Sequence, residues 1–317
     1  MMFSSRIADV ITNRLNLGPL DQLFQQIIIS FLLLNGFAGL DWIINRRLSL
    51  SSSNALPKRP TSSQEWLRGV ALGWGMTLVT ILPIVVAGSF HPLFWFSPRS
   101  WGLAVVALFT IVLLALNLEL AFRGYIFVHL IAAIGPEAAS ILLSLLYALL
   151  SSLRPNSTSV SIAVTFLFGL LFSAAYLRTH ALWLGCGVHF AWYATMALLL
   201  GLPVAAYTTL CTPISATVSG PLWLSGGAYG PEGAALSVMV VIPAVFILYR
   251  MTRGYAWDYT HEPIVPMGYA VTIAPPAAHT AIEAEAAAKL DALVQIGAAP
   301  SMISGTPVTD DRTRSKE

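Results

Sequence analysis

Apolar stretches of about twenty residues, separated by short polar or turn-forming segments, run through most of the chain. The hydrocarbon core of a bilayer is about 30 Å thick, and a helix needs about 20 apolar residues to cross it. The pattern therefore predicts an all-α fold, a polytopic transmembrane helix bundle with about seven spans. We expect these spans at residues 23–44, 66–87, 101–122, 137–153, 160–177, 181–200 and 234–249.

The span boundaries divide the chain into four predicted regions. These are an amphipathic N-terminal lead-in, a first transmembrane helix with a polar loop, a main membrane domain and a partly disordered cytoplasmic tail, at residues 1–22, 23–65, 66–250 and 251–317. The apolar stretch 124–134 is too short to cross a bilayer, and Gly135 and Pro136 end it. We therefore do not count it as a span.

Composition supports lipid as the main solvent of the chain. Of its 317 residues, 56% are hydrophobic and only 10% are charged, and the mean hydropathy is +0.72. Soluble domains carry about 25% charged residues. The net charge of +2 and the lack of a basic patch with interleaved aromatic residues give no sign of a nucleic-acid partner. The two cysteines, Cys186 and Cys211, form neither a disulfide framework nor a CxxC metal motif.

Lysine and arginine are unevenly distributed between the two sides that alternating spans define. Residues 201–233 contain neither, and the side with this loop holds only Arg6, Arg14, Arg99 and Arg154. Loops rich in lysine and arginine stay in the cytoplasm. The sequence thus predicts an outside N-terminus, a cytoplasmic C-terminal tail, and a cytoplasmic location for Arg46, Arg47, Lys58, Arg59, Arg68, Arg123, Arg178, Arg250 and Arg253.

Two ionisable residues, Glu119 and Arg123, lie four positions apart at the end of the third predicted span. This spacing puts both side chains on one face of a helix. A charged side chain in a bilayer costs at least ~2.5–3.5 kcal/mol, so such residues usually pair and often mark a functional site. A structural ion pair that fastens helices together is the alternative interpretation, and the two residues alone leave both open.

His189 is the second polar residue of interest within a predicted span, and Tyr193 shares its helix face. A neutral imidazole can ligate a metal or accept a proton, but it can equally be a hydrogen-bonded core histidine. Cys186 lies three positions earlier, which gives only two of the three protein ligands that a zinc site needs. A triad of Ser151, His189 and Glu119 has no nucleophile-elbow motif to support it.

Several short motifs together resemble the CAAX protease and bacteriocin-processing family, intramembrane endopeptidases also called Abi proteins or type II CAAX prenyl proteases. The motifs are Glu119-Leu-Ala-Phe-Arg123-Gly, Tyr147-x-x-x-Ser151, Leu167-Phe-Gly169, Leu177-Arg-Thr-His-Ala-Leu-Trp183 and Gly187-Val-His189-Phe-Ala-Trp192. The segment from Gly220 to Gly233 also looks like one in bacterial members. The resemblance covers residues 66–250 and implies hydrolysis of prenylated or membrane-embedded peptides in a bacterial plasma membrane.

The resemblance implies three site residues. The family motifs are Glu-Glu-x-x-x-Arg, Phe-x-x-x-His and His-x-x-x-Asn or Asp, and this chain retains the second glutamate as Glu119, the arginine as Arg123 and the last histidine as His189. By family resemblance a divalent metal such as zinc is a conceivable cofactor, with His189 as its ligand. If a site remains, we expect Glu119 to act as the base and His189 as a ligand or orienting group.

The chain departs from the family at three other positions. Leu118 replaces the water-activating glutamate, Ser151 a histidine, and Tyr193 the asparagine or aspartate. Leucine cannot accept a proton, and a general base contributes about 10²–10⁴ to the rate. The sequence therefore predicts weak or absent peptide cleavage and leaves two classes open: an unusual intramembrane endopeptidase, or a silent relative that binds a membrane peptide, lipid or protein. A carrier or channel has little support, since the predicted spans hold few ionisable residues and no charged ring.

Overall fold

The computed structural model describes residues 2–15, 21–48, 56, 60–204, 213–253, 284, 285 and 288. The chain separates into two units, Met1–Glu262 and Pro263–Glu317. In the second unit only residues 284, 285 and 288 are described, and they are helical. Most of the predicted tail and Cys211 therefore lie outside the described residues.

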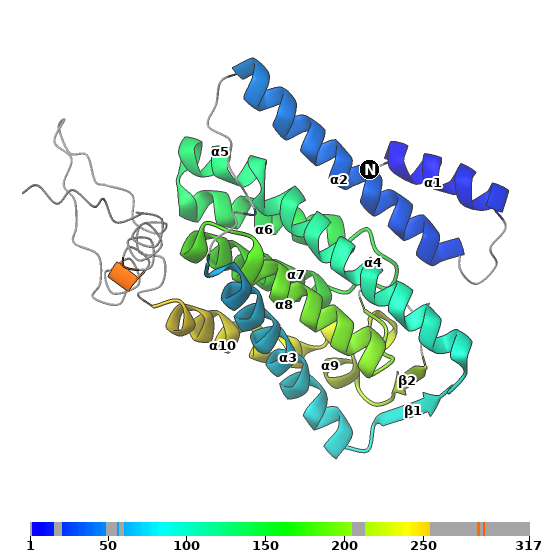
Figure 1. Cartoon of the computed structure of the whole chain (residues 1–317). Coiled ribbons are helices and arrows are strands. Elements are labelled where there is room, and N and C mark those ends of the chain that lie inside the picture. The colour runs from blue at the N-terminus through cyan, green and yellow to red at the C-terminus, as the bar shows by residue number, and fades with distance from the viewer. Residues whose placement is uncertain are drawn as a thin grey trace, which may run out of the picture. The chain divides into compact units, whose positions relative to one another are not determined.

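The described part of the first unit is a bundle of apolar helices (Figure 1). Its longer helices are α1 (Met2–Leu15), α2 (Asp21–Leu48), α3 (Ser62–Val86), α4 (Pro98–Arg123), α5 (Tyr125–Ile134), α6 (Pro136–Ser151), α7 (Ser159–Thr179), α8 (Trp183–Ala194) and α10 (Ala235–Met251). A π-helical turn, η2 (Thr195–Leu199), continues α8. Short helices before α10 are α9 (Leu222–Ser225), η3 (Gly227–Tyr229) and η4 (Pro231–Gly233).

The predicted all-α transmembrane fold is confirmed. Among the described residues, three helical stretches are long and apolar enough to cross a bilayer: α3, residues 98–134 and α7. Shorter apolar helices occur at Phe24–Phe37, Pro136–Ser151, Trp183–Leu199 and Ala235–Met251. Each predicted span therefore falls on a helix. The uncounted stretch 124–134 forms α5, which a non-helical Gly124 separates from α4.

A small two-stranded sheet is a feature that the hydrophobic pattern did not predict. Strand β1 (Phe90–Phe94) pairs antiparallel with β2 (Ile214–Val218), and Phe90 lies opposite Val218. The strands are short, and β1 contains Pro92, which cannot donate a ladder hydrogen bond. Because of its short length and its proline, β1 lacks the sequence pattern that predicts a strand. The pairing fastens the loop after α3 to the loop before α9, at one end of the bundle (Figure 1).

Helices α3 and α8 pack side by side along most of their length (Figure 1). Their backbones come so close that a Cβ on Gly69 would lie 2.2 Å from the carbonyl oxygen of Leu184, and one on Gly187 would lie 2.5 Å from that of Trp66. Small residues at a helix contact allow this approach in membranes, where dispersion contacts hold helices together. The contact fixes the position of α8, the helix that carries His189.

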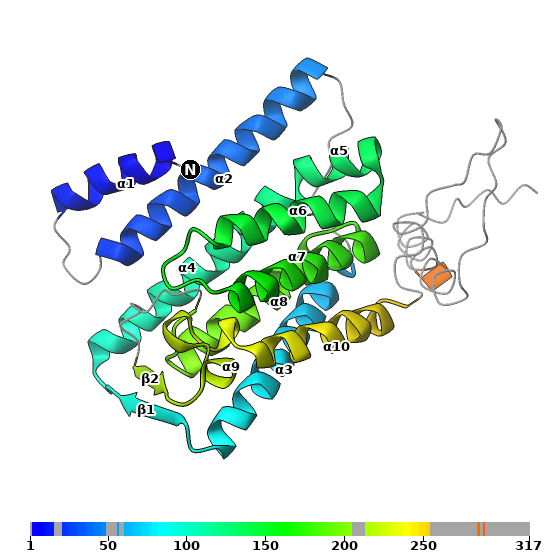
Figure 2. The same cartoon turned by 180° about the vertical axis from the view of Figure 1, so that it is seen from behind.

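The C-terminal ends of α7 and α10 lie together, as Figure 2 shows from behind. Arg178 donates hydrogen bonds from Nε to the hydroxyl of Thr252 and from Nη2 to its carbonyl oxygen, at 3.0 and 2.9 Å. Arg123, in contrast, is fully buried within the bundle. Its burial reflects helix packing, and the cytoplasmic location of Arg123 stays a prediction.

The close contact of α3 with α8 predicts opposite outcomes for two glycines of the same helix. Gly69→Ala forces the two backbones apart, and we expect a loss of about 1–3 kcal/mol in unfolding free energy, typical of overpacking. Gly75 faces open space, so Gly75→Ala is expected to be neutral or stabilising by up to about 1 kcal/mol. Unfolding in mixed micelles checks both, and equal stability of the two variants would contradict the packing argument.

Cysteine labelling tests the predicted orientation. On a background of Cys186→Ser and Cys211→Ser, Thr217→Cys places an exposed thiol on β2 and Arg253→Cys places one just after α10. We expect a membrane-impermeant maleimide, added outside intact cells, to label position 217 and not position 253 until the membrane is opened. The reverse pattern would show that the lysine and arginine distribution misassigns the cytoplasmic side.

Candidate functional site

Glu119 and His189, on different helices, meet inside the bundle. Glu119 lies in the last turns of α4 and His189 lies in the second half of α8, and their side chains are 1% and 2% exposed. The Nδ1 atom of His189 lies 3.2 Å from Oε1 of Glu119. Gly185 leaves room for the carboxylate, because a Cβ there would lie 3.0 Å from its Oε2 atom. Neighbouring positions on a helix point about 100° apart, and the structure turns Glu119 toward the histidine.

Arg123 completes this buried group and connects α4 to α7. Its Nη1 atom lies 3.8 Å from Oε1 of Glu119, and its Nη2 donates a hydrogen bond of 2.9 Å to the carbonyl oxygen of Gly169. The guanidinium carbon lies 5.3–5.5 Å from the ring centres of Phe122, Tyr147 and Phe172. Aromatic faces stabilise a desolvated cation. Arg123 is placed to hold helices together and not to reach the cavity.

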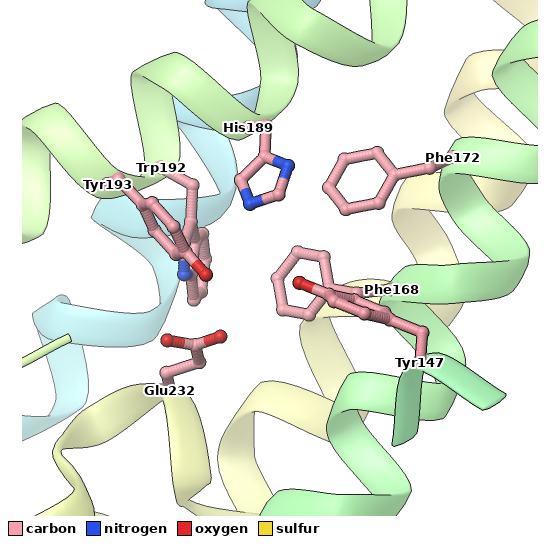
Figure 3. Close-up of a pocket in the computed structure, with 7 residues that line it drawn as sticks. All are labelled: Tyr147, Phe168, Phe172, His189, Trp192, Tyr193 and Glu232. Carbon is pink, nitrogen blue, oxygen red and sulfur yellow. The ribbon is translucent and has the colours of Figure 1, made fainter. Parts of the chain in front are cut away.

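A small cavity lies on the other side of the His189 ring (Figure 3). Its volume of about 10 Å³ is near the minimum of about 10–15 Å³ for one water molecule. The ring of Phe172 stacks on the imidazole at 4.8 Å. Ring nitrogens, phenol groups and a carboxylate converge on this space, which is lined by Tyr147, Phe168, Phe172, His189, Trp192, Tyr193 and Glu232.

Sequence reasoning missed Glu232. This residue belongs to η4, is 5% exposed and lines the cavity together with His189. The available signal was a lone acidic residue between Pro231 and Gly233 in a long loop without lysine or arginine. Nothing in the sequence says that this loop folds back onto α8. The contact is tertiary.

A second cation, Arg154, lies near this carboxylate. Its Nη1 atom donates a hydrogen bond of 3.4 Å to the hydroxyl of Tyr229. Its positive charge interacts electrostatically with the Glu232 carboxylate. Burial, and next the negative charge of Glu232, raise the pKa of the Tyr229 phenol. Tyr229 therefore stays protonated at neutral pH. The outer part of the site thus combines one carboxylate, one guanidinium and neutral phenols.

Of the three substituted family positions, only Tyr193 lines the cavity. Leu118 packs against the main hydrophobic core. Ser151 is buried, and its hydroxyl donates a hydrogen bond of 2.7 Å to the carbonyl oxygen of Ala148 in its own helix. Ser151 is not among the cavity residues, so the structure does not assemble a triad of Ser151, His189 and Glu119.

The residues around His189 do not fit a zinc site. Cys186 packs in a separate apolar cluster with Phe127, Leu143 and Leu182. Across the described residues, no three histidine, cysteine, aspartate or glutamate side chains are grouped to hold a metal ion. Zinc requires at least three protein ligands.

The buried group predicts how stability responds to charge removal. Arg123→Ala strands the Glu119 carboxylate in the bundle, and we expect a loss of about 3–5 kcal/mol in unfolding free energy. Adding Glu119→Gln removes the stranded charge and still offers His189 an acceptor, so the double variant should be the more stable of the two. Arg99→Ala, at an exposed position, is the matched control. A double variant that is no more stable than Arg123→Ala would contradict the pairing.

Comparison with known proteins gives one match. Residues 99–195 match a family model described as type II CAAX prenyl endopeptidase Rce1-like. This segment runs from α4 through α8 and contains Glu119, Arg123 and His189. No curated protein and no solved structure matches the chain. The match confirms the resemblance seen in the motifs: over residues 99–195 the chain is similar to the CAAX-type intramembrane proteases.

Proposed function

We propose that this protein is an intramembrane endopeptidase of the CAAX prenyl protease type, which hydrolyses prenylated or membrane-embedded peptides in a bacterial plasma membrane. One observation carries the proposal: the hydrogen bond between His189 and Glu119 lies beside a cavity of the size of one water molecule. The family match supports the reaction class.

The hydrogen bond assigns different tasks to the two residues. A carboxylate at Glu119 accepts the proton of Nδ1, so the lone pair of a neutral His189 lies on the other ring nitrogen. That nitrogen points toward the cavity (Figure 3). His189 therefore accepts a hydrogen bond from the reacting water. Glu119 acts through His189 as a positioning residue, a role that differs from the base expected from the sequence.

The surrounding hydroxyl groups suit the charge that develops during hydrolysis. Attack of water on a peptide carbonyl creates an oxyanion, and fixed hydrogen-bond donors in a dry site stabilise it. The phenol groups of Tyr147 and Tyr193 both line the cavity. Tyr193 supplies a donor at the position where this chain lacks the amide or carboxylate of the family motif, and Tyr147 supplies a second donor beside it.

A second candidate function is a silent relative that binds a membrane peptide, lipid or protein. It is favoured by the packing of Leu118 against the core and by the hydrogen bond of Ser151 to its own helix. The size of the cavity also favours it, because about 10 Å³ admits a water molecule and no peptide backbone. Cleavage thus requires the cavity wall to open for the substrate.

Purified full-length protein in liposomes tests the proposal with a farnesylated CAAX peptide and a membrane-anchored reporter peptide. We expect slow cleavage of at least one substrate by the unmodified protein. His189→Ala should lower kcat/KM by about 10²–10⁴, the contribution of an acid–base group. His129→Gln is the matched control, since His129 bonds to the carbonyl oxygen of Tyr125 on α5. EDTA should leave cleavage unchanged because the donor set does not fit zinc.

Two results would contradict the enzyme interpretation. Absence of cleavage of both peptides by the unmodified protein would favour the silent relative. Cleavage that survives His189→Ala would show that the reaction occurs elsewhere. Glu119→Gln should give an intermediate loss, because glutamine still accepts the proton of Nδ1 but forms a weaker hydrogen bond than a carboxylate and orients the ring less firmly.

A further inference from the structure

Glu232 faces His189 across the cavity, from an element outside the matched family segment (Figure 3). Figure 3 shows its carboxylate directed into the space between Tyr193 and Tyr147. The residue is 5% exposed, so its carboxylate is held inside the protein. A buried carboxylate that lines a polar cavity is a candidate for acid–base chemistry.

The backbone around Glu232 is fixed on both sides. The carbonyl oxygen of Pro231 accepts a 2.7 Å hydrogen bond from the hydroxyl of Ser237 on α10. Gly230 has a φ of +100°, and a Cβ there would lie 2.2 Å from the carbonyl oxygen of Pro203. Only glycine fits this close approach in the left-handed region. The loop therefore presents Glu232 from a defined position.

The polar groups around Glu232 indicate a small polar ligand. Trp192 lines the cavity and is buried, and its Nε1 atom has no hydrogen-bond partner in the described part of the chain. A buried donor without a partner costs about 1–3 kcal/mol, which a water molecule in the cavity would recover. Arg154 supplies a positive charge that interacts with the Glu232 carboxylate. The cavity thus offers an anionic acceptor, an imidazole acceptor and several donors.

We propose that Glu232 is a catalytic residue of this site, the carboxylate that takes the proton from the attacking water. This inference rests on the proposed function. The water molecule donates one hydrogen to the free ring nitrogen of His189 and the other to Glu232. The cavity lies between these two acceptors, as Figure 3 shows.

The reaction then balances with water as the only co-reactant. The water oxygen bonds to the scissile carbonyl carbon, its proton moves to Glu232, and the carbonyl electron pair moves to the oxygen, where phenol donors stabilise it. When the C–N bond breaks, the protonated Glu232 returns the proton to the leaving nitrogen. The products are a carboxylic acid and an amine, and Glu232 is a carboxylate again.

The inference also explains how the chain could work with leucine at position 118. Leu118 packs against the core and carries no proton acceptor. A carboxylate that enters from η4 reaches the same cavity as His189 by a different route. In this arrangement α4 orients the imidazole through Glu119, and the loop before α10 supplies the proton acceptor.

Substitution of Glu232 in the full-length protein tests the inference, with the same farnesylated and membrane-anchored peptides. Glu232→Gln keeps the shape and removes the proton acceptor, so kcat/KM should fall by about 10²–10⁴. Glu232→Asp keeps a carboxylate and should retain measurable cleavage with an altered pH profile. Glu137→Gln, at an exposed position on α6, is the matched control and should cleave like the unmodified protein. Thermal unfolding of each variant separates loss of folding from loss of chemistry.

The outcomes separate this inference from the proposed function. If the unmodified protein cleaves and a folded Glu232→Gln variant cleaves equally well, the role of Glu232 is refuted and the endopeptidase stands. If the unmodified protein cleaves neither peptide, both fail. A shift of the acidic limb of the kcat/KM profile in Glu232→Asp, together with the loss of rate in Glu232→Gln, would support the proton transfer, because a purely structural residue would not move that limb.

Discussion

The buried contact among Glu119, Arg123 and His189 is the interaction on which the arrangement of the central helices depends. Charges within a bilayer are tolerated only when they pair or reach a polar cavity. Here both conditions are met, because the carboxylate lies between a guanidinium and an imidazole, and the imidazole borders the cavity. Helices α4 and α8 thereby acquire a fixed relative position, and the bond from Arg123 to Gly169 adds α7.

Two further constraints place the remaining walls of the site. The glycine contact of α3 with α8 brings the two backbones together and leaves α8 little freedom to move. The pairing of β1 with β2 holds the segment before α9 at one end of the bundle. Close backbone packing in membranes relies on small residues, and strand pairing relies on hydrogen bonds between distant segments. Together they allow a loop residue, Glu232, to line a cavity with His189.

The site consequently has an inner and an outer half. The inner half, Glu119 with Arg123 and His189, lies within the family segment 99–195, whereas Glu232 follows that segment along the chain. When the family positions are compared one by one, the site lacks a glutamate and a histidine, at Leu118 and Ser151. In the folded chain neither Leu118 nor Ser151 lines the cavity, whereas Glu232 does.

Local sequence patterns are sufficient to predict the helices and the ion pair within α4. Length and apolar composition set the spans, and a spacing of four residues set the contact of Glu119 with Arg123, because both depend on neighbouring residues only. Only the packed bundle shows that Glu119 turns toward His189, that Arg123 is buried, that β1 pairs with β2, and that Glu232 lines the cavity. These four features involve segments that are far apart along the chain, or they depend on how whole helices are rotated about their axes. Their geometry comes from the packing of the bundle, which no local pattern records.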